Sequence, residues 1–284
     1  MMPKATARAA CIIGWPVEHS RSPLIHNYWL KLYRIGGAYR CEAVPPEKFA
    51  EFINDLAARG YAGANVTVPH KHAALALSAP DERAQKVGAA NTLWFDAGVL
   101  RSTNTDVEGF LHNLDACAPH WEESTKKAVV LGAGGAARAV IYGLLVRGVD
   151  CILVTNRTSG RAESLRHDFG DRVRAAPWDE RNALLADAAL VVNATTLGME
   201  HGPPLALDVG RLPGRAVVAD LVYAPLDTPL AKAAKARGLR TADGVGMLLY
   251  QAVRGFTLWF GKKPAVTAEL RALVEADLAR AAAE

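Results

Sequence analysis

Short apolar runs alternate with longer amphipathic stretches along almost the whole chain. Runs such as Ala9–Gly14, Ala62–Val68 and Cys151–Thr155 have the length of buried strands, and helical spacing dominates between such runs. Alternating strands and helices pack as layers around a mainly parallel sheet. The pattern therefore predicts an α/β protein.

Turn and cap residues refine several of these elements. Thr92–Phe95 and Val99–Ser102 flank Asp96-Ala97-Gly98, which predicts a hairpin. Ser22-Pro23 predicts a helix start, with Ser22 as N-cap. A further helix is expected over Pro46–Arg59 because Gly60 follows it.

A polar, proline-containing stretch at Pro119–Lys127 separates two series of strands and helices. The 284 residues also exceed one typical domain. We expect a substrate-binding domain over residues 1–107, completed by C-terminal helices within 244–284. A Rossmann-type domain over 108–243 is then inserted, with a cleft between the two domains.

The segment from Val129 to Arg138 carries the pattern G-x-G-x-x-A after an apolar strand and at the start of a helix. Gly132 permits a tight turn, Gly134 lets backbone N–H groups approach a pyrophosphate, and Ala137 allows close helix–strand packing. The helix N-terminus favours the anion. This segment predicts a dinucleotide site.

The next strand ends in Asn156-Arg157-Thr158, followed by Arg161. NAD-binding folds usually place a carboxylate here for the ribose 2′-hydroxyl, and this sequence has none. Guanidinium groups suit a 2′-phosphate, so NADP is favoured over NAD. The alternative is that both arginines are solvated charges at a helix start.

Composition narrows the partners. The formal net charge is +4, and no basic block accompanies it, so no nucleic acid is expected as a partner. No membrane is expected either, because the apolar run 128–146 holds Arg138 and a glycine cluster at its centre. The four cysteines form no C-x-x-C pair, which favours a cytoplasmic protein. His70 and His72 lack a third ligand nearby, so no metal is expected. Monomer and homodimer both stay open.

Polar residues gather at predicted strand ends in the first half of the chain. One cluster contains Ser20 and Ser22, a second runs from Asn65 to Lys71, and a third is Asn104-Thr105-Asp106. Ligands of α/β proteins bind where strand ends converge, so these side chains are candidates for a substrate site. A plain N-cap is the alternative for Ser22.

These residues carry a family resemblance: the chain resembles the shikimate dehydrogenases. The matching stretches cover nearly the whole chain in order: GWPVEHSRSPLIHN (14–27), GANVTVPHK (63–71), ANTL (90–93), NTDVEG (104–109), the glycine turn (132–137), NRT (156–158), NATTLGM (193–199), DLVYAPLDTPL (220–230) and DGVGMLLYQ (243–251).

The resemblance implies reversible, NADPH-dependent reduction of 3-dehydroshikimate to shikimate, a step of aromatic amino acid biosynthesis. It also implies the site residues. Lys71 and Asp106 become the catalytic pair, with Lys71 as proton donor and acceptor. The substrate-binding set is Ser20, Ser22, Asn65, Thr67, Asn91, Tyr223 and Gln251. The NADP-binding set is Gly132, Ala133, Gly134, Gly135, Ala136, Ala137, Asn156, Arg157, Thr158, Arg161, Thr195, Leu221, Gly244, Met247 and, by a loose alignment, Glu82.

Two alternatives stay open at this point. One is a quinate or quinate/shikimate dehydrogenase that uses NAD. The other is a non-catalytic homologue that senses a ligand, against which the presence of both Lys71 and Asp106 counts.

Overall fold

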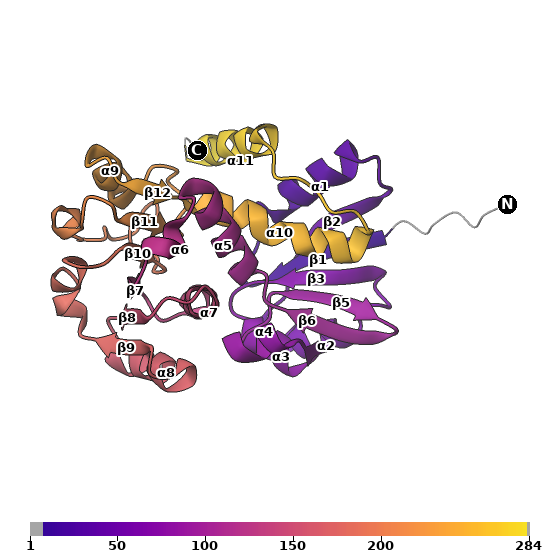
Figure 1. Cartoon of the computed structure of the whole chain (residues 1–284). Coiled ribbons are helices and arrows are strands. Elements are labelled where there is room, and N and C mark those ends of the chain that lie inside the picture. The colour runs from indigo at the N-terminus through magenta and orange to yellow at the C-terminus, as the bar shows by residue number, and fades with distance from the viewer. Residues whose placement is uncertain (1–7, 283–284) are drawn as a thin grey trace. The chain divides into compact units, whose positions relative to one another are not determined.

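The computed structural model describes residues 8–282 (Figure 1). The chain divides into two compact units. The first takes the chain up to Thr105 together with Gln251–Leu270, and the second takes Asp106–Tyr250 together with the chain from Arg271 onward. The predicted substrate domain also included residues 1–7 and 283–284, which lie outside the described residues. Residues 244–250 and 271–282, predicted for that domain, group with the second unit.

The first unit is built on a mixed six-stranded sheet of order β2-β1-β3-β5-β6-β4. Its strands are β1 (Arg8–Gly14), β2 (Gly37–Ala43), β3 (Tyr61–Val66), β4 (Ala79–Pro80), β5 (Thr92–Asp96) and β6 (Val99–Thr103). β1 pairs in parallel with β2 and β3, whereas β5 runs antiparallel to β3 and β6. The ends of β1, β3 and β6 and the start of β5 therefore meet at one edge.

Helices and 3-10 turns cover this sheet. They are α1 (Ser22–Leu32), η1 (Pro46–Lys48), α2 (Phe49–Asn54), α3 (Lys71–Ala76), α4 (Glu82–Val87) and the C-terminal part of α10 (Gly244–Phe260). Side chains of α2, α3 and α4 pack with Cys11, Ile13 and Leu93 in one core. Trp259 of α10 packs with Ala10 and Ile12 in another. Period-two alternation along β1 places these neighbours on opposite faces.

The predicted hairpin is confirmed. β5 and β6 pair antiparallel around Ala97 and Gly98, whose φ angles are 48° and 82°. Positive φ at both central positions is the geometry of a two-residue hairpin turn, and glycine adopts it without strain.

The second unit contains an entirely parallel six-stranded sheet of order β12-β11-β10-β7-β8-β9. Its strands are β7 (Lys127–Leu131), β8 (Cys151–Thr155), β9 (Val173–Ala176), β10 (Leu190–Asn193), β11 (Val217–Asp220) and β12 (Arg240–Ala242). Its helices and turns are α5 (Asp106–Cys117), α6 (Trp121–Ser124), α7 (Gly135–Val146), α8 (Ser159–Phe169), η2 (Trp178–Glu180), η3 (Ala183–Leu185), η4 (Val209–Arg211), α9 (Pro229–Ala236) and most of α11 (Ala268–Ala281).

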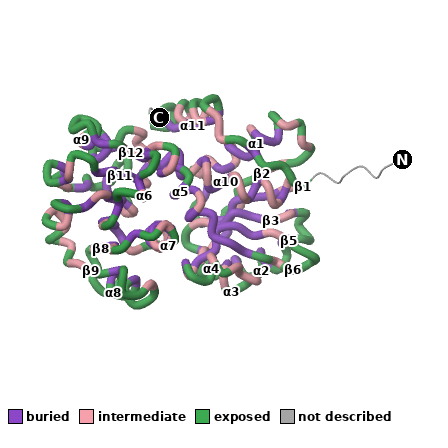
Figure 2. The backbone as a smooth tube through the Cα atoms, viewed as in Figure 1, coloured by how far each residue is buried: buried purple, intermediate pink, exposed green. Residues whose placement is uncertain are grey.

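The central strands β7, β10 and β11 of the second sheet are almost continuously buried, since helices lie on both faces (Figure 2). Strand order reverses between β7 and β10, which are neighbours although β8 and β9 separate them in sequence. Such a reversal opens a crevice at the carboxyl ends of the strands, where α/β proteins bind nucleotides. The fold thus has the predicted α/β class with a Rossmann-type second unit.

Candidate active site

Backbone hydrogen bonds join the segments at the polar edge of the first sheet. The Thr67 N–H donates to the Ile13 carbonyl at 2.9 Å, which ties the end of β3 to β1. The Asn91 N–H donates to the Thr103 carbonyl at 3.1 Å, which ties the start of β5 to the end of β6. The edge therefore brings the Asn65–Lys71 segment and the Asn104-Thr105 segment of the first unit to the ends of neighbouring strands.

The side chain of Asn91 is buried and held by Thr105. Its Oδ1 accepts from the Thr105 N–H at 2.7 Å and from the Thr105 hydroxyl at 3.1 Å. An N–H can only donate, so this contact fixes which end of the amide is the oxygen. The amide nitrogen of Asn91 therefore points away from Thr105 and can act as a donor.

Asn65 is buried as well, and its amide hydrogens are used inside the protein. Its Nδ2 donates to the Asn91 carbonyl at 3.2 Å and to the Thr92 hydroxyl at 3.1 Å, and its Oδ1 accepts from the Tyr39 hydroxyl at 2.6 Å. Burial raises the pKa of Tyr39 well above its usual range, so the phenol stays protonated and donates. Asn65 therefore has both amide protons committed to neighbouring protein groups.

Lys71 is the first residue of α3, and its backbone is fixed to the Asn91 segment. Its carbonyl accepts from the Ala90 N–H at 3.0 Å.

Thr67, four residues before Lys71, lies against Gly14: a Cβ on that glycine would stand 2.5 Å from the Thr67 methyl carbon. The absence of a side chain at position 14 thus lets the β1 and β3 loops approach closely.

Ser22 is buried at the start of α1 but is not its N-cap. The cap residue is Arg21, with no side-chain capping bond, so the predicted cap role of Ser22 is wrong. Ser22 instead donates its N–H to the Ser20 hydroxyl at 3.3 Å. The two hydroxyl residues are thus adjacent at this helix start.

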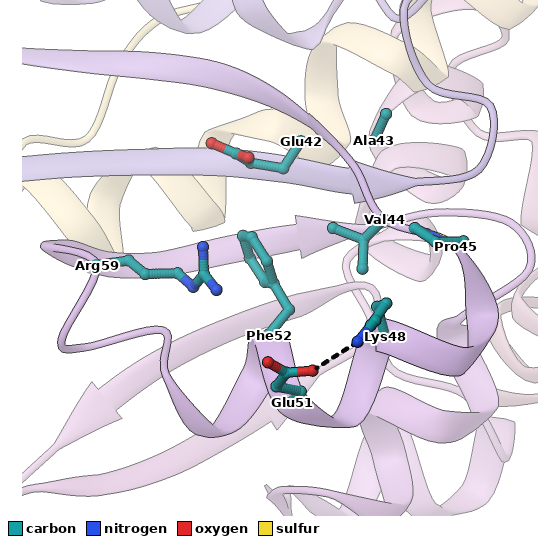
Figure 3. A pocket seen from close by; sticks show the side chains of 8 residues that line it. All are labelled: Glu42, Ala43, Val44, Pro45, Lys48, Glu51, Phe52 and Arg59. Atoms are coloured by element: carbon teal, nitrogen blue, oxygen red, sulfur yellow. Dashed lines mark hydrogen bonds and ion pairs between the residues drawn. The ribbon is translucent and has the colours of Figure 1, made fainter.

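A surface depression of about 310 Å³ lies elsewhere on the first unit (Figure 3). Lys48 and Glu51 pair at 3.3 Å within it, the Arg59 guanidinium lies over the Phe52 ring, and Glu42 accepts from the Tyr61 hydroxyl. Each of its charged side chains thus already has a partner, and the depression contains no predicted site residue.

The glycine turn of the second unit has the geometry that its sequence predicts. Gly132 has a φ of +106°, and a Cβ there would stand 2.8 Å from the Ala194 carbonyl oxygen. A Cβ on Gly134 or Gly135 would meet nothing within 4 Å. α7 begins directly after Gly134 without a side-chain capping bond, so its first N–H groups face open space.

A pocket of about 170 Å³ continues from this turn. It is lined by Gly132, Ala133, Gly134, Asn156, Arg157, Trp178, Ala194, Thr195, Thr196 and Leu197. Six predicted cofactor residues thus line one pocket. Ala136, Ala137, Thr158 and Arg161, also predicted, lie in α7 or at the start of α8.

Thr195 uses its hydroxyl within the loop after β10. The hydroxyl donates to Asn193 Oδ1 at 2.7 Å and accepts from the Leu197 N–H at 3.1 Å. The residue therefore shapes the pocket wall with its backbone and methyl group.

Sequence reasoning missed Asp220 as an organising residue. This buried carboxylate accepts from Asn193 Nδ2 at 2.9 Å, from the Val222 N–H at 3.1 Å and from the Thr228 hydroxyl at 2.6 Å. Burial raises the pKa of Asp220, against the opposing effect of these hydrogen bonds. Both Asn193 and Asp220 end apolar strands, which is the signal that points to them.

The remaining predicted residues divide between the units. Leu221, Tyr223, Gly244 and Met247 belong to the second, and a Cβ on Gly244 would stand 2.4 Å from the Leu221 carbonyl. Asp106 is buried at the start of α5. Gln251 belongs to the first unit and is buried in α10, whereas Glu82 is exposed at the start of α4 in that unit and lies outside the glycine-turn pocket.

None of the helices within residues 8–282 is both long and apolar enough to span a membrane.

Comparison with known proteins identifies the family. Three family models match: the shikimate dehydrogenase substrate binding domain over residues 12–93, shikimate/quinate 5-dehydrogenase over 118–199, and the shikimate 5′-dehydrogenase C-terminal domain over 244–273. A shikimate dehydrogenase (NADP(+)) of Rhodopseudomonas palustris is 64% identical over 97% of this chain and 99% of its own length.

Solved structures agree. Quinate dehydrogenase from Corynebacterium glutamicum, in complex with NAD, has a TM-score of 0.87 at 31% identity, covering 95% of this chain and 99% of that one. Shikimate 5-dehydrogenase from Thermus thermophilus, in complex with NADP(H) and shikimate, has a TM-score of 0.83 at 36% identity, covering 97% and 99%. The chain therefore belongs to the shikimate dehydrogenase family.

Proposed function

We propose that this protein catalyses the reversible, NADPH-dependent reduction of 3-dehydroshikimate to shikimate, in aromatic amino acid biosynthesis. Near-full-length relatives carry this activity in their names. Within the structure, the observation that supports it most is the hydrogen-bonded polar edge of the first sheet, which fixes the Lys71 backbone against the Asn91 segment. An ammonium and several oriented donors together suit a hydroxylated carboxylic acid.

The second unit fits NADP. The open turn at Gly134 and the uncapped N-terminus of α7 suit a pyrophosphate. Arg157 lines the same pocket, and no carboxylate follows β8 at the place where NAD-binding folds usually hold the ribose. Bound NADPH supplies the hydride, and NADP accepts it in the reverse direction.

Lys71 and Asp106 are the proposed catalytic pair. In the reducing direction the Lys71 ammonium protonates the developing alkoxide and stabilises its charge. In the oxidising direction its amine takes the hydroxyl proton. Asp106 positions the ammonium.

The other predicted residues bind or position the substrate. Ser20 and Ser22, adjacent at the start of α1, bind the substrate carboxylate, with Tyr223 as a further contact. Thr67, Asn91 and Gln251 bind ring hydroxyls. Asn65 has its amide protons committed inside the protein, so we assign it a positioning role.

The test is a matrix of rates, followed by NADPH absorbance. Purified protein is assayed with shikimate, quinate and 3-dehydroshikimate, each with the NADP and the NAD pair. We expect the highest kcat/KM for shikimate with NADP. No turnover on any pair, with ligand binding intact, would contradict the proposal and support a sensing role instead.

The second candidate is quinate oxidation with NAD, favoured by the similarity to the NAD-bound quinate dehydrogenase. The same rate matrix distinguishes the two candidates, because this second candidate predicts the highest kcat/KM for quinate with NAD. We further propose that the protein is cytoplasmic, since all four cysteines are free thiols. We propose a monomer or a homodimer as its oligomeric state.

A further inference from the structure

Trp178 is a lining residue of the glycine-turn pocket that the family motifs do not include. It follows β9 in the short turn η2. In the parallel pairing of β8 and β9, Thr155 is opposite Ala176, so Arg157 and Trp178 each stand two residues beyond the paired ends. The two side chains therefore lie at the same edge of the sheet, in the same pocket.

The pocket has room for only part of a dinucleotide. Its volume of about 170 Å³ is below the about 300–1,000 Å³ of pockets that enclose whole drug-sized ligands. One wall is the glycine turn, which suits the pyrophosphate. Asn156, Arg157 and Trp178 form another wall, beyond the ribose position, where a base belongs.

Arg181 holds the indole of Trp178 in place. Its Cζ lies 4.9 Å from the ring centroid, its Nε donates to the Ala206 carbonyl at 3.1 Å, and its Nη1 donates to the Trp178 carbonyl at 3.0 Å. Trp178 lines the pocket, whereas Arg181 does not, so the guanidinium supports the ring without being part of the pocket wall. The indole is thus held by protein contacts before any ligand binds.

We propose that Trp178, supported by Arg181, is the surface on which the adenine of NADP stacks. This inference rests on the proposed NADP-dependent function and names a contact within that site. An indole is the best aromatic platform for a base, because both present π faces, and stacking of this kind is worth about ten- to a hundredfold in affinity. Stacking reads the base and not the 2′-phosphate.

The probe is 2′,5′-ADP, which contains the adenosine half of NADP without nicotinamide. Binding to the full chain is measured by tryptophan fluorescence and by calorimetry. We expect wild-type fluorescence to be quenched on binding, Trp178→Phe to lose the quench, and the control Trp94→Phe, in the first unit, to retain it. Affinity should fall in the order wild type, Trp178→Phe, Trp178→Leu, with the last at least tenfold weaker.

A second comparison separates base from phosphate. Trp178→Leu should weaken NADP and NAD by the same factor, whereas Arg157→Ala should weaken NADP far more than NAD. Since Trp178 also packs against the second unit's core, Leu is used to keep an apolar side chain there, and melting without ligand shows that each variant is folded. Binding of 2′,5′-ADP by folded Trp178→Leu within twofold of wild type would overturn the proposal.

The readouts also separate this inference from the proposed function. If the wild-type protein does not turn over shikimate but binds 2′,5′-ADP in a way that depends on Trp178, the proposed substrate is wrong and the adenine contact is supported. Failure of the wild-type protein to bind 2′,5′-ADP would overturn both.

Discussion

His26 makes the first unit sensitive to acid, and the size of the effect follows from its burial. The ring is fully buried and stacks on Tyr39 at a centroid distance of 4.1 Å and an interplanar angle of 10°. Burial lowers the pKa of His26 from 6.5 to about 3, against an opposing contribution from Asn65. The native state therefore keeps this imidazole neutral at pH values where an unfolded chain protonates it.

The direction of the pH dependence follows. Below pH 6.5 the unfolded chain binds one more proton at this position than the native state does, so stability falls as pH falls, until the native His26 protonates near pH 3. Each pH unit within that window corresponds to about 1.4 kcal/mol. Between pH 7 and pH 5 the loss from this one group is about 2 kcal/mol, a large share of a typical folding free energy.

The variant that isolates the effect is His26→Phe, which keeps an aromatic ring against Tyr39 and removes the titration. Urea unfolding is followed by tryptophan fluorescence, because Trp29 and Trp259 lie 5.7 and 5.5 Å from the His26 ring. The variant's own packing change shifts its stability by the same amount at every pH. Its stability relative to wild type should therefore rise by about 2 kcal/mol from pH 7 to pH 5.

The matched control is His201→Gln, since His201 is exposed on the second unit. Its stability relative to wild type should stay nearly constant over the same pH range. A constant difference for His26→Phe as well would refute the claim that burial holds this imidazole neutral.

Three further outcomes are expected. Lys71→Ala and Asp106→Ala should each lower kcat by roughly 10²-fold or more while leaving cofactor binding intact, as single-turnover and binding assays would show; near-normal turnover would end the assigned role. Arg157→Ala should raise the KM for NADP with little change for NAD, and equal changes would remove the 2′-phosphate argument. Asp220→Ala should destabilise the chain by about 1–3 kcal/mol, because three donors lose their acceptor. Asp220→Asn should gain stability relative to wild type as pH rises above about 4, because burial raises the pKa of the native carboxyl. Thermal melting of both variants at pH 4 and pH 7 tests these two expectations.

Uninterrupted apolar runs were predictable as strands, and short segments that include an arginine were not. The strand at Cys151–Thr155 was expected where it occurs, because it is an uninterrupted apolar run. β9 and β12 were missed, since four and three residues that include an arginine carry no periodic signal. Pairing with an already formed neighbour supplies what the local sequence lacks.

The helix expected over Pro46–Arg59 was too long. The structure has a 3-10 turn and then α2, which ends at Asn54. Asn54 and Asp55 are poor helix formers, and the chain must turn there to bring Tyr61 into β3, as the bond from the Tyr61 N–H to the Leu56 carbonyl at 3.2 Å shows. The tertiary structure therefore ends this helix earlier than the sequence pattern predicts.

Within the candidate site, motifs located the residues but not their partners. Asn65 was identified from its segment, whereas its acceptor role toward Tyr39 joins residues 26 positions apart and leaves no local trace. The same holds for Asp220 and Thr228, which meet only because β11 ends beside the start of α9.

These partners bear on how the site acts. A buried amide or carboxylate beside a ligand site is useful only if its orientation is fixed before the ligand arrives. Thr105 fixes Asn91, Tyr39 fixes Asn65, and Arg181 holds Trp178, each by contacts within a single unit. Tyr39 and Arg181 were not predicted as site residues, and Thr105 was predicted only as a member of a polar cluster, without its partner Asn91. Short motifs therefore identify the residues proposed to contact substrate and cofactor. The neighbours that fix the orientation of these side chains are brought next to them only by the fold.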